Sequence, residues 1–112
     1  MATHFQQDTE DTPVLFRVHR SPKTHGAEVT AVFPTLPADY AGHEMTCFEH
    51  VGQHGGCSFG WYNETRPAIP DEYEGLKREL EGAPYGYRLK VYKRINRKLR
   101  DQFNAEVRRL SA

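Results

Sequence analysis

Long apolar runs are missing from this 112-residue chain, and none approaches the roughly 20 residues that a helix needs to cross a bilayer. The first 13 residues also lack the apolar core of a secretory signal, so we expect a cytoplasmic protein with no membrane association. Cysteine is scarce, with only Cys47 and Cys57 present. In a reducing compartment this favours two free thiols over a structural disulfide.

A net charge is absent as well, because 15 Lys and Arg balance 15 Asp and Glu. The zero hides a split along the chain. From Arg88 onward there are nine basic residues and two acidic ones, so the remaining sequence holds six bases and thirteen acids. The C-terminal quarter therefore has a charge of about +7 and the rest about −7. This asymmetry affects the electrostatic potential around the protein and the partners it attracts, but it does not indicate a fold.

Alternating and β-branched segments predict four strands, at residues 14–20, 28–33, 44–51 and 85–95. The first two are separated by a Pro- and Gly-containing turn, which favours an antiparallel hairpin. Prolines and a glycine predict a loop at residues 34–42, and four glycines predict another at 52–60. Leu15 is the one residue that does not fit the alternation of the first strand.

Two segments have helical periodicity. Residues 70–81 begin with a proline and two acids and end before Gly82, with an expected buried stripe of Ile69, Tyr73, Leu76 and Leu80. For residues 96–110 we expect Asn96 to cap a helix that buries Leu99, Phe103, Val107 and Leu110.

These elements predict an α+β fold. We expect a flexible N-terminal tail at residues 1–12 and a single domain at 13–112 with the order β-β-β-α-β-α. Three consecutive strands followed by a crossover helix predict a mostly antiparallel four-stranded sheet with two helices packed on one face.

Short stretches in a fixed order carry a resemblance to a known family. They are LFR at 15–17, VTAVFP at 29–34, HVGQH at 50–54, RPA at 66–68, EY at 72–73, and GYRLKVYKR at 86–94. Over roughly residues 14–95 the chain resembles a family of small uncharacterised proteins of bacteriophages and other mobile elements. The resemblance implies a bacterial host cell and brings no activity, ligand or catalytic residue. Ile69 stands where that family has Thr, which removes a helix cap worth about 1 kcal/mol.

A His/Cys cluster occupies the segment from His43 to Cys57. Its possible zinc ligands are Cys47, His50, His54 and Cys57. Thiolate and imidazole suit tetrahedral zinc, but the spacing matches no common zinc motif. If 44–51 is a strand, Cys47 and His50 point to opposite faces. We therefore expect no cofactor, with zinc as the alternative and buried or hydrogen-bonding side chains as the interpretation we adopt.

The same segment offers two further hypotheses. Cys57 lies three residues after His54 among glycines, an arrangement that a cysteine enzyme could use, but no third orienting residue follows and we assign no catalytic residue. His50, Gln53 and His54, with Trp61 nearby, could form a polar recognition site. The alternative is that these side chains tie the loop to the sheet.

The basic end offers a second binding surface, whose candidate residues are Arg94, Arg97, Lys98 and Arg100. Such charges suit phosphate, and neighbouring tyrosines could stack on bases. The interpretation we prefer for these charges is a solvated helix face that balances the acidic body, since zero net charge is unusual for a nucleic-acid binder. Our functional prediction is an accessory protein that binds a macromolecule, a host or phage protein in the first interpretation and nucleic acid in the alternative. An enzyme or zinc protein is the further alternative, and a homodimer is possible.

Overall fold

The central strand of the fold is covered on both faces. The structure is a computed structural model that describes residues 11–21, 28–49 and 53–111. In β1 (Thr12–His19) every residue from Val14 to His19 is buried. Leu15 departs from the apolar alternation for this reason, since a strand that is buried on both sides needs apolar residues at successive positions.

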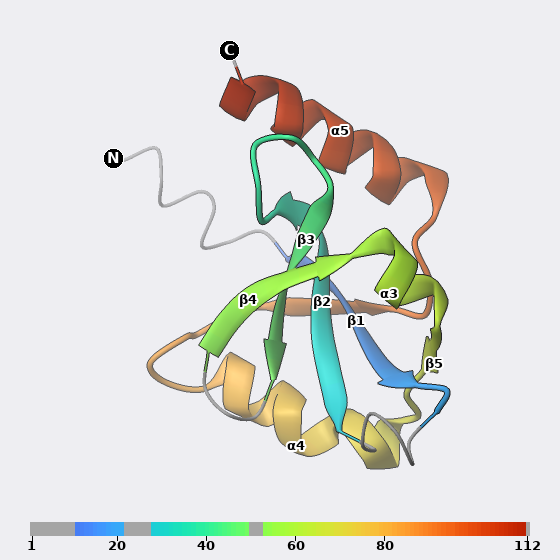
Figure 1. Ribbon diagram of the computed structural model, residues 1–112. Coiled ribbons are helices and arrows are strands. Elements are labelled where there is room, and N and C mark those ends of the chain that lie inside the picture. The colour runs from blue at the N-terminus through green and yellow to red at the C-terminus, as the bar shows by residue number, and fades with distance from the viewer. Residues whose placement is uncertain (1–10, 22–27, 50–52, 112) are drawn as a thin grey trace.

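Five further strands join β1 in one sheet (Figure 1). They are β2 (Val29–Pro37), β3 (Glu44–Glu49), β4 (Gln53–Ser58), β5 (Thr65–Pro67) and β6 (Leu89–Tyr92). The order is β4-β3-β2-β1-β5 with antiparallel neighbours, while β6 pairs with β1 in parallel. The predicted hairpin is confirmed, with Leu15 opposite Val32, and so is the mostly antiparallel α+β class. The sheet has six strands and not the predicted four.

The glycine-rich loop expected at residues 52–60 is a wrong prediction. Residues 53–58 form β4, which pairs with β3 from Gln53–Glu49 to Ser58–Glu44. Strand β4 lies at the edge of the sheet and is held by main-chain hydrogen bonds to β3. These bonds do not depend on side chains, so a glycine-rich segment can form them. At Gly56 an added Cβ would lie 2.5 Å from Oε1 of Glu44 and 3.2 Å from Cβ of Ala38, so a side chain there would displace the Glu44 carboxylate.

Strand β2 also extends further than expected, through two prolines. Pro34 and Pro37 lie beyond Val32, the last residue of β2 that pairs with β1. The ladder with β3 is irregular between Phe33 and Pro37. Proline is tolerated there because β1 no longer pairs with this part of β2 and the ladder with β3 is interrupted.

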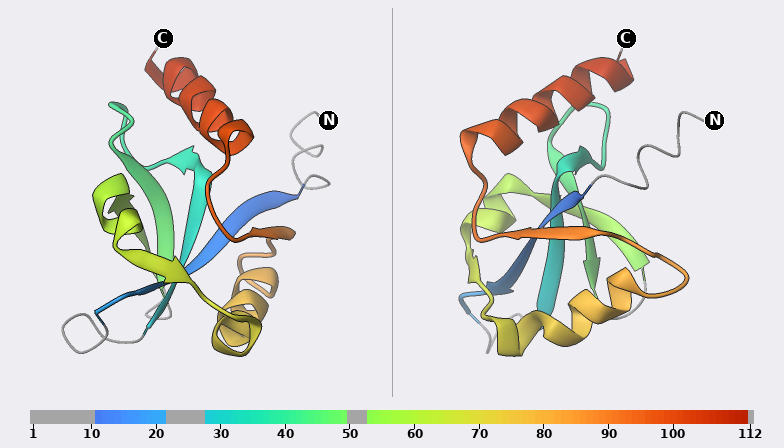
Figure 2. Two further views of the ribbon diagram at one scale, coloured as in Figure 1. Left: turned by 90° about the vertical axis from the view of Figure 1, so that its right-hand side faces the viewer. Right: turned by 180° about the vertical axis from the view of Figure 1, so that it is seen from behind.

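The two long helices lie on opposite faces of the sheet and not on one face (Figures 1 and 2). Leu76 and Leu80 of α4 (Pro70–Glu81) pack with Val14, Phe16, Ala31, Phe33 and Phe48. Phe103 of α5 (Arg97–Ser111) packs with Leu15, Val32, Met45 and Cys57. The strands alternate between these two sets, so each helix covers one side. A short helix, α3 (Phe59–Asn63), joins β4 to β5.

The helix ends follow the sequence closely. Asn96 caps α5 as predicted, since its Oδ1 accepts the Leu99 N–H at 2.8 Å. Ile69 offers α4 no side-chain cap, but the Glu72 carboxylate accepts the Ile69 N–H at 2.9 Å. The predicted stripes are right only in part, because Ile69 and Leu110 are exposed. Within residues 11–21, 28–49 and 53–111, no helix is both long and apolar enough to cross a membrane.

Candidate functional site

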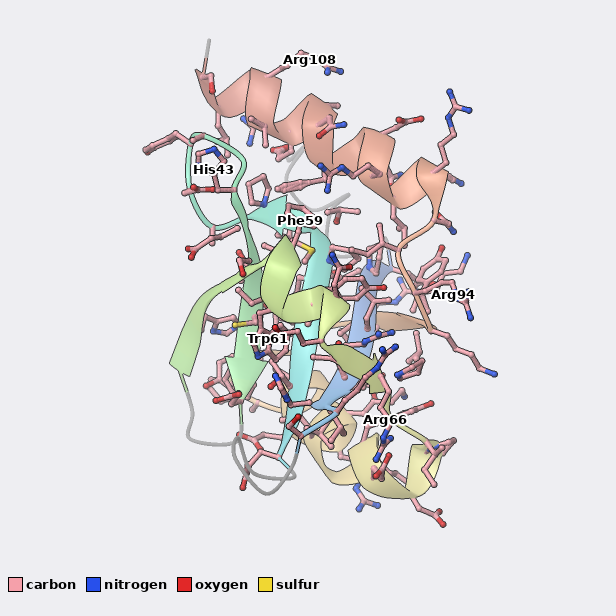
Figure 3. The ribbon with its side chains drawn as sticks, turned by 45° about the vertical axis from the view of Figure 1, so that its right-hand side comes forward. His43, Phe59, Trp61, Arg66, Arg94 and Arg108 are labelled. Atoms are coloured by element: carbon pink, nitrogen blue, oxygen red, sulfur yellow. The ribbon has the colours of Figure 1, made fainter. Side chains whose placement is uncertain are left out.

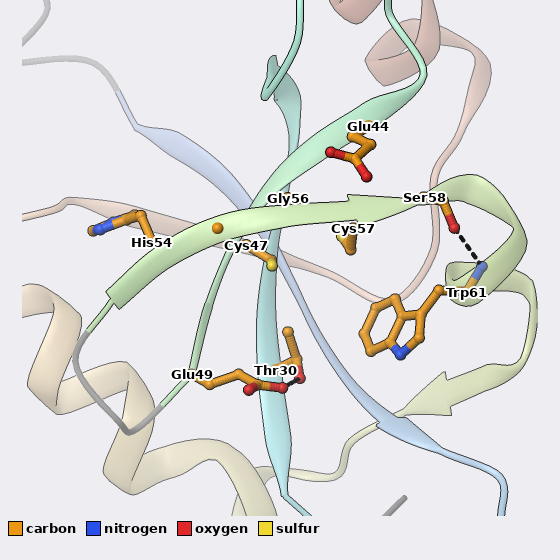
Figure 4. Close-up of a pocket in the computed structure, with 10 residues that line it drawn as sticks. Thr30, Glu44, Cys47, Glu49, His54, Gly56, Cys57, Ser58 and Trp61 are labelled. Atoms are coloured by element: carbon orange, nitrogen blue, oxygen red, sulfur yellow. Dashed lines mark hydrogen bonds between the residues drawn. The ribbon is translucent and has the colours of Figure 1, made fainter.

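Two regions of the fold bring together side chains that could react or bind a ligand. The first is a cavity of about 510 Å³ on the α5 side of the sheet, between β3, β4 and α3 (Figure 4). Cys47 and Cys57 line it, with Trp61 at one end. Thr30 donates a hydrogen bond to the Glu49 carboxylate at 2.7 Å beside the thiols.

The two cysteines interact with each other. Cys47 faces Gly55 across the ladder and Cys57 faces Met45, so the thiols are diagonal neighbours on one face of the sheet. A hydrogen bond from the Cys57 thiol lowers the pKa of Cys47, and that hydrogen bond together with burial raises the pKa of Cys57. Cys47 is half-buried and Cys57 is buried. The more acidic and more accessible thiol is therefore Cys47.

His54 does not belong to this thiol pair. Its ring lies 4.9 Å from Phe48 and 5.5 Å from Tyr85, and its Nε2 is hydrogen-bonded to the Tyr87 hydroxyl at 3.1 Å. Phe48 belongs to the core on the α4 side, opposite the cysteines. His54 thus ties the edge strand to the residues that follow α4.

This arrangement bears on the three hypotheses for the His/Cys segment. Cys57 has neither the accessible thiolate nor the adjacent imidazole that a nucleophile needs. The four-residue zinc set is not assembled, because His54 is on the other face and His50 lies outside the described residues. Among the residues that the structure describes, no three His, Cys, Asp or Glu gather as ligands. His54 and Trp61 both line the cavity, but the His54 ring packs against Phe48 on the α4 side whereas Trp61 lies on the α5 side, so the two rings of the predicted polar recognition site do not face each other.

The second region lies where β6 leads into α5 (Figure 3). Arg17 of β1 is at its centre, only 5% exposed. Its Nε donates to Thr65 Oγ1 at 2.8 Å, Nη2 to the Thr65 carbonyl at 2.9 Å, and Nη1 to the Lys93 carbonyl at 2.6 Å. The Tyr62 ring lies beneath the guanidinium, with its centroid 4.5 Å from Cζ.

Further contacts fix the partners of Arg17. Thr65 Oγ1 donates to the Tyr62 carbonyl at 2.6 Å, and the Tyr62 hydroxyl accepts the Ile95 N–H at 3.0 Å. Burial lowers the pKa of Arg17, and the charges of Arg20 and Arg94 lower it further. Arg17 thus joins β1, α3, β5 and the end of β6. Arg17 and Arg20 were not among the predicted site residues, because they lie in and just after β1, far in sequence from the basic C-terminal quarter.

The predicted basic residues divide by their partners. Arg97 and Lys98 are exposed in the first turn of α5. Arg100 lies over the Phe59 ring, with Cζ 4.1 Å from the centroid. In the described part of the chain none of these three forms an ion pair, nor does Arg94, whereas Arg88 pairs with Asp11 and Arg109 with Glu106.

Comparisons with known proteins do not extend this picture. No family model matches the chain, and no curated protein or solved structure matches it either. The resemblance to phage proteins therefore stays a prediction.

Proposed function

We propose that the protein binds single-stranded nucleic acid through the start of α5. The observation that carries the proposal is the row of cations at Arg97, Lys98 and Arg100, which have no carboxylate partner within the described residues. Phosphate groups along a strand would supply the missing negative charge. The predicted solvated face would leave the same exposed bases hydrated, and titration with an oligonucleotide distinguishes the two.

Aromatic side chains beside these cations support a single-stranded ligand. Arg100 places its guanidinium over the Phe59 ring, and Phe59 contacts Phe103 with ring centroids 5.3 Å apart. This stacking fixes one cation in place, so less side-chain entropy is lost when it contacts a phosphate. Half-buried Tyr62 lies in the same region, and such rings offer bases a surface on which to stack.

The test is titration of a fluorescently labelled 12-nucleotide single strand, followed by anisotropy at several salt concentrations. The double variant Arg97→Gln/Lys98→Gln should weaken binding about tenfold and reduce the slope of log K against log salt by about 1.4, at 0.7 for each lost contact. The matched control is Lys77→Gln/Arg78→Gln, which removes two charges from α4. Equal losses in both variants, or no binding by the natural protein at low salt, would exclude the proposal.

A protein partner is the second candidate, favoured by an apolar cavity beside α4. Ile69 is 57% exposed at its rim. Phe16 and Tyr73 stack within it with centroids 4.5 Å apart, and Val91 completes a volume of about 520 Å³. An apolar side chain of a host or phage protein would fit such a groove. Failure of the oligonucleotide titration would leave this candidate as the function to pursue.

A further inference from the structure

Arg17 is a buried charge whose neighbours do not neutralise it. Each of its hydrogen-bond acceptors, the Thr65 hydroxyl and the carbonyls of Thr65 and Lys93, is uncharged. A buried charge is costly unless it is paired, and most buried arginines meet a carboxylate. Glu64, which is close in sequence to this region, is instead 3.2 Å from the His19 ring.

Two more arginines join Arg17 around one pocket of about 310 Å³. Its lining residues are Arg17, Arg20, Tyr62, Asn63, Thr65, Pro67, Arg94 and Ile95. No acidic side chain is among them, and neither Arg20 nor Arg94 forms an ion pair with any residue that the structure describes. The fold thus places three positive charges around one pocket, and a bound anion would reduce the repulsion between them.

The pocket is rich in donors and poor in acceptors. A guanidinium carries five N–H groups, and the three bonds of Arg17 leave one on each terminal nitrogen. The guanidiniums of Arg20 and Arg94 add their own donors, and Asn63 adds an amide. A ligand with several acceptor oxygens and more than one negative charge would match this set. A phosphate monoester has three terminal oxygens and close to two charges, whereas a phosphodiester or a carboxylate has two oxygens and one charge.

The structure also holds the pocket in shape before any ligand arrives. Arg17 is fixed by Thr65, Lys93 and Tyr62, which come from three different segments. Arg94 follows directly from Lys93, whose carbonyl Arg17 binds. Ligand binding would therefore cost little ordering of the buried part of the site.

We propose that this pocket, formed by Arg17, Arg20 and Arg94, binds a phosphate monoester, the terminal phosphate of a nucleic-acid strand. The inference rests on the proposed function, because Arg94 and Ile95 of the pocket directly precede the start of α5, so the pocket lies next to a strand bound at Arg97 and Lys98. The protein would then prefer ends over internal sites, and phosphorylated ends over hydroxyl ends.

The experiment compares two copies of one 12-nucleotide single strand, with a 5′-phosphate or a 5′-hydroxyl, and a third with a 3′-phosphate. We expect about tenfold tighter anisotropy-measured binding of one phosphorylated strand than of the hydroxyl strand. The double variant Arg20→Gln/Arg94→Gln should bind all three strands equally. Arg97→Gln/Lys98→Gln should weaken all three and preserve their ratio, which separates the pocket from the helix surface.

Each failure has its own meaning. Equal binding of all three strands by the natural protein overturns the inference and leaves the proposed function intact. If no strand binds, the proposed function is wrong, and phenyl phosphate is titrated alone while the arginine side-chain NMR signals are followed. Shifts that vanish in Arg20→Gln/Arg94→Gln support the pocket and assign the phosphate to another carrier, with a phosphopeptide tested next. No shift at about 10 mM phenyl phosphate overturns it.

Discussion

Two regions differ in how far apart their residues lie in the sequence: the cavity lined by Cys47 and Cys57 (the thiol cavity) and the pocket lined by Arg17, Arg20 and Arg94 (the arginine pocket). Cys47, His54 and Cys57 are close in the chain, yet the fold places the imidazole on one face of the sheet and the thiols on the other. Arg17 and Arg94 are 77 positions apart, yet they line one pocket. In a strand, residues at an odd spacing face opposite sides, so proximity in sequence separates side chains as often as it gathers them.

The two regions also differ in how charge is compensated. At the thiols, one neutral group hydrogen-bonds the other and both retain an internal partner. At the arginines, neutral carbonyls and an aromatic ring accept the donors but supply no negative charge. A site that satisfies its own groups has no need of a ligand, whereas uncompensated charge indicates one.

The largest effect should follow from Arg17→Gln. Loss of the guanidinium removes three hydrogen bonds and takes the donor from the buried Thr65 carbonyl and the part-buried Lys93 carbonyl, so we expect the free energy of unfolding to fall by about 3 kcal/mol. Urea denaturation at pH 7 measures it. Arg20→Gln, a change at the rim of the same pocket, should alter stability by less than about 0.5 kcal/mol. A stability loss shared equally by both variants would mean that Arg17 is no structural centre.

A smaller effect concerns the thiols. Because its pKa is lowered and it is more accessible, Cys47 should react with iodoacetamide at pH 7 about tenfold faster than Cys57. Mass spectrometry of digested samples gives the two rates.

The variants of this pair test the cause. Cys57→Ala removes the thiol that stabilises the Cys47 thiolate, so the pH at which Cys47 reacts at half its maximal rate should rise. Cys47→Ala should leave Cys57 slow at every pH below 9. Faster reaction at Cys57 than at Cys47 would reverse the assignment and reopen Cys57 as a nucleophile.

The smallest effect concerns Arg66, which, in contrast to Arg17, pairs with a carboxylate, that of Glu72. Glu72 accepts two hydrogen bonds from Arg66 and one from the Ile69 N–H, which lowers its pKa to about 2. Since the folded pKa lies below the ordinary 4.5, this stabilisation is present above about pH 4.5 and is lost as the pH falls toward 2.

Glu72→Ala should therefore cost about 1 kcal/mol at pH 7 and almost nothing near pH 2, in thermal unfolding followed by circular dichroism. Glu74→Ala, which removes the exposed partner of Arg78, should have a smaller effect at both pH values. A difference at Glu72 that is independent of pH would attribute the loss to the helix backbone and not to the charge.

Much of the fold could be predicted from local signals. The Pro and Gly turns and the β-branched runs predicted the first hairpin, and Pro70, Gly82 and Asn96 set the helix ends that the structure has. Two conclusions were wrong for one reason. The side of the sheet that a helix covers, and the pairing of a glycine-rich segment such as β4, depend on contacts distant in sequence.

The sites were harder to predict. The C-terminal bases were visible as a change in composition, but which of them lacked a carboxylate partner was not. Arg17 carried no signal at all, since a basic residue in an alternating strand is normally a solvent-facing one. Its burial follows from α3, whose Tyr62 ring lies against the guanidinium, and from Thr65 of β5, the strand that pairs with this end of β1.

By itself the sequence determined the class of the fold, the cores of most strands and both long helices, because capping, turn chemistry and periodicity act within a few residues. Only the tertiary structure decided which side chains meet: two thiols without a histidine, and three arginines without an acid. The physical reason is that pairing across a sheet joins residues according to register and face, and neither is encoded in their spacing along the chain.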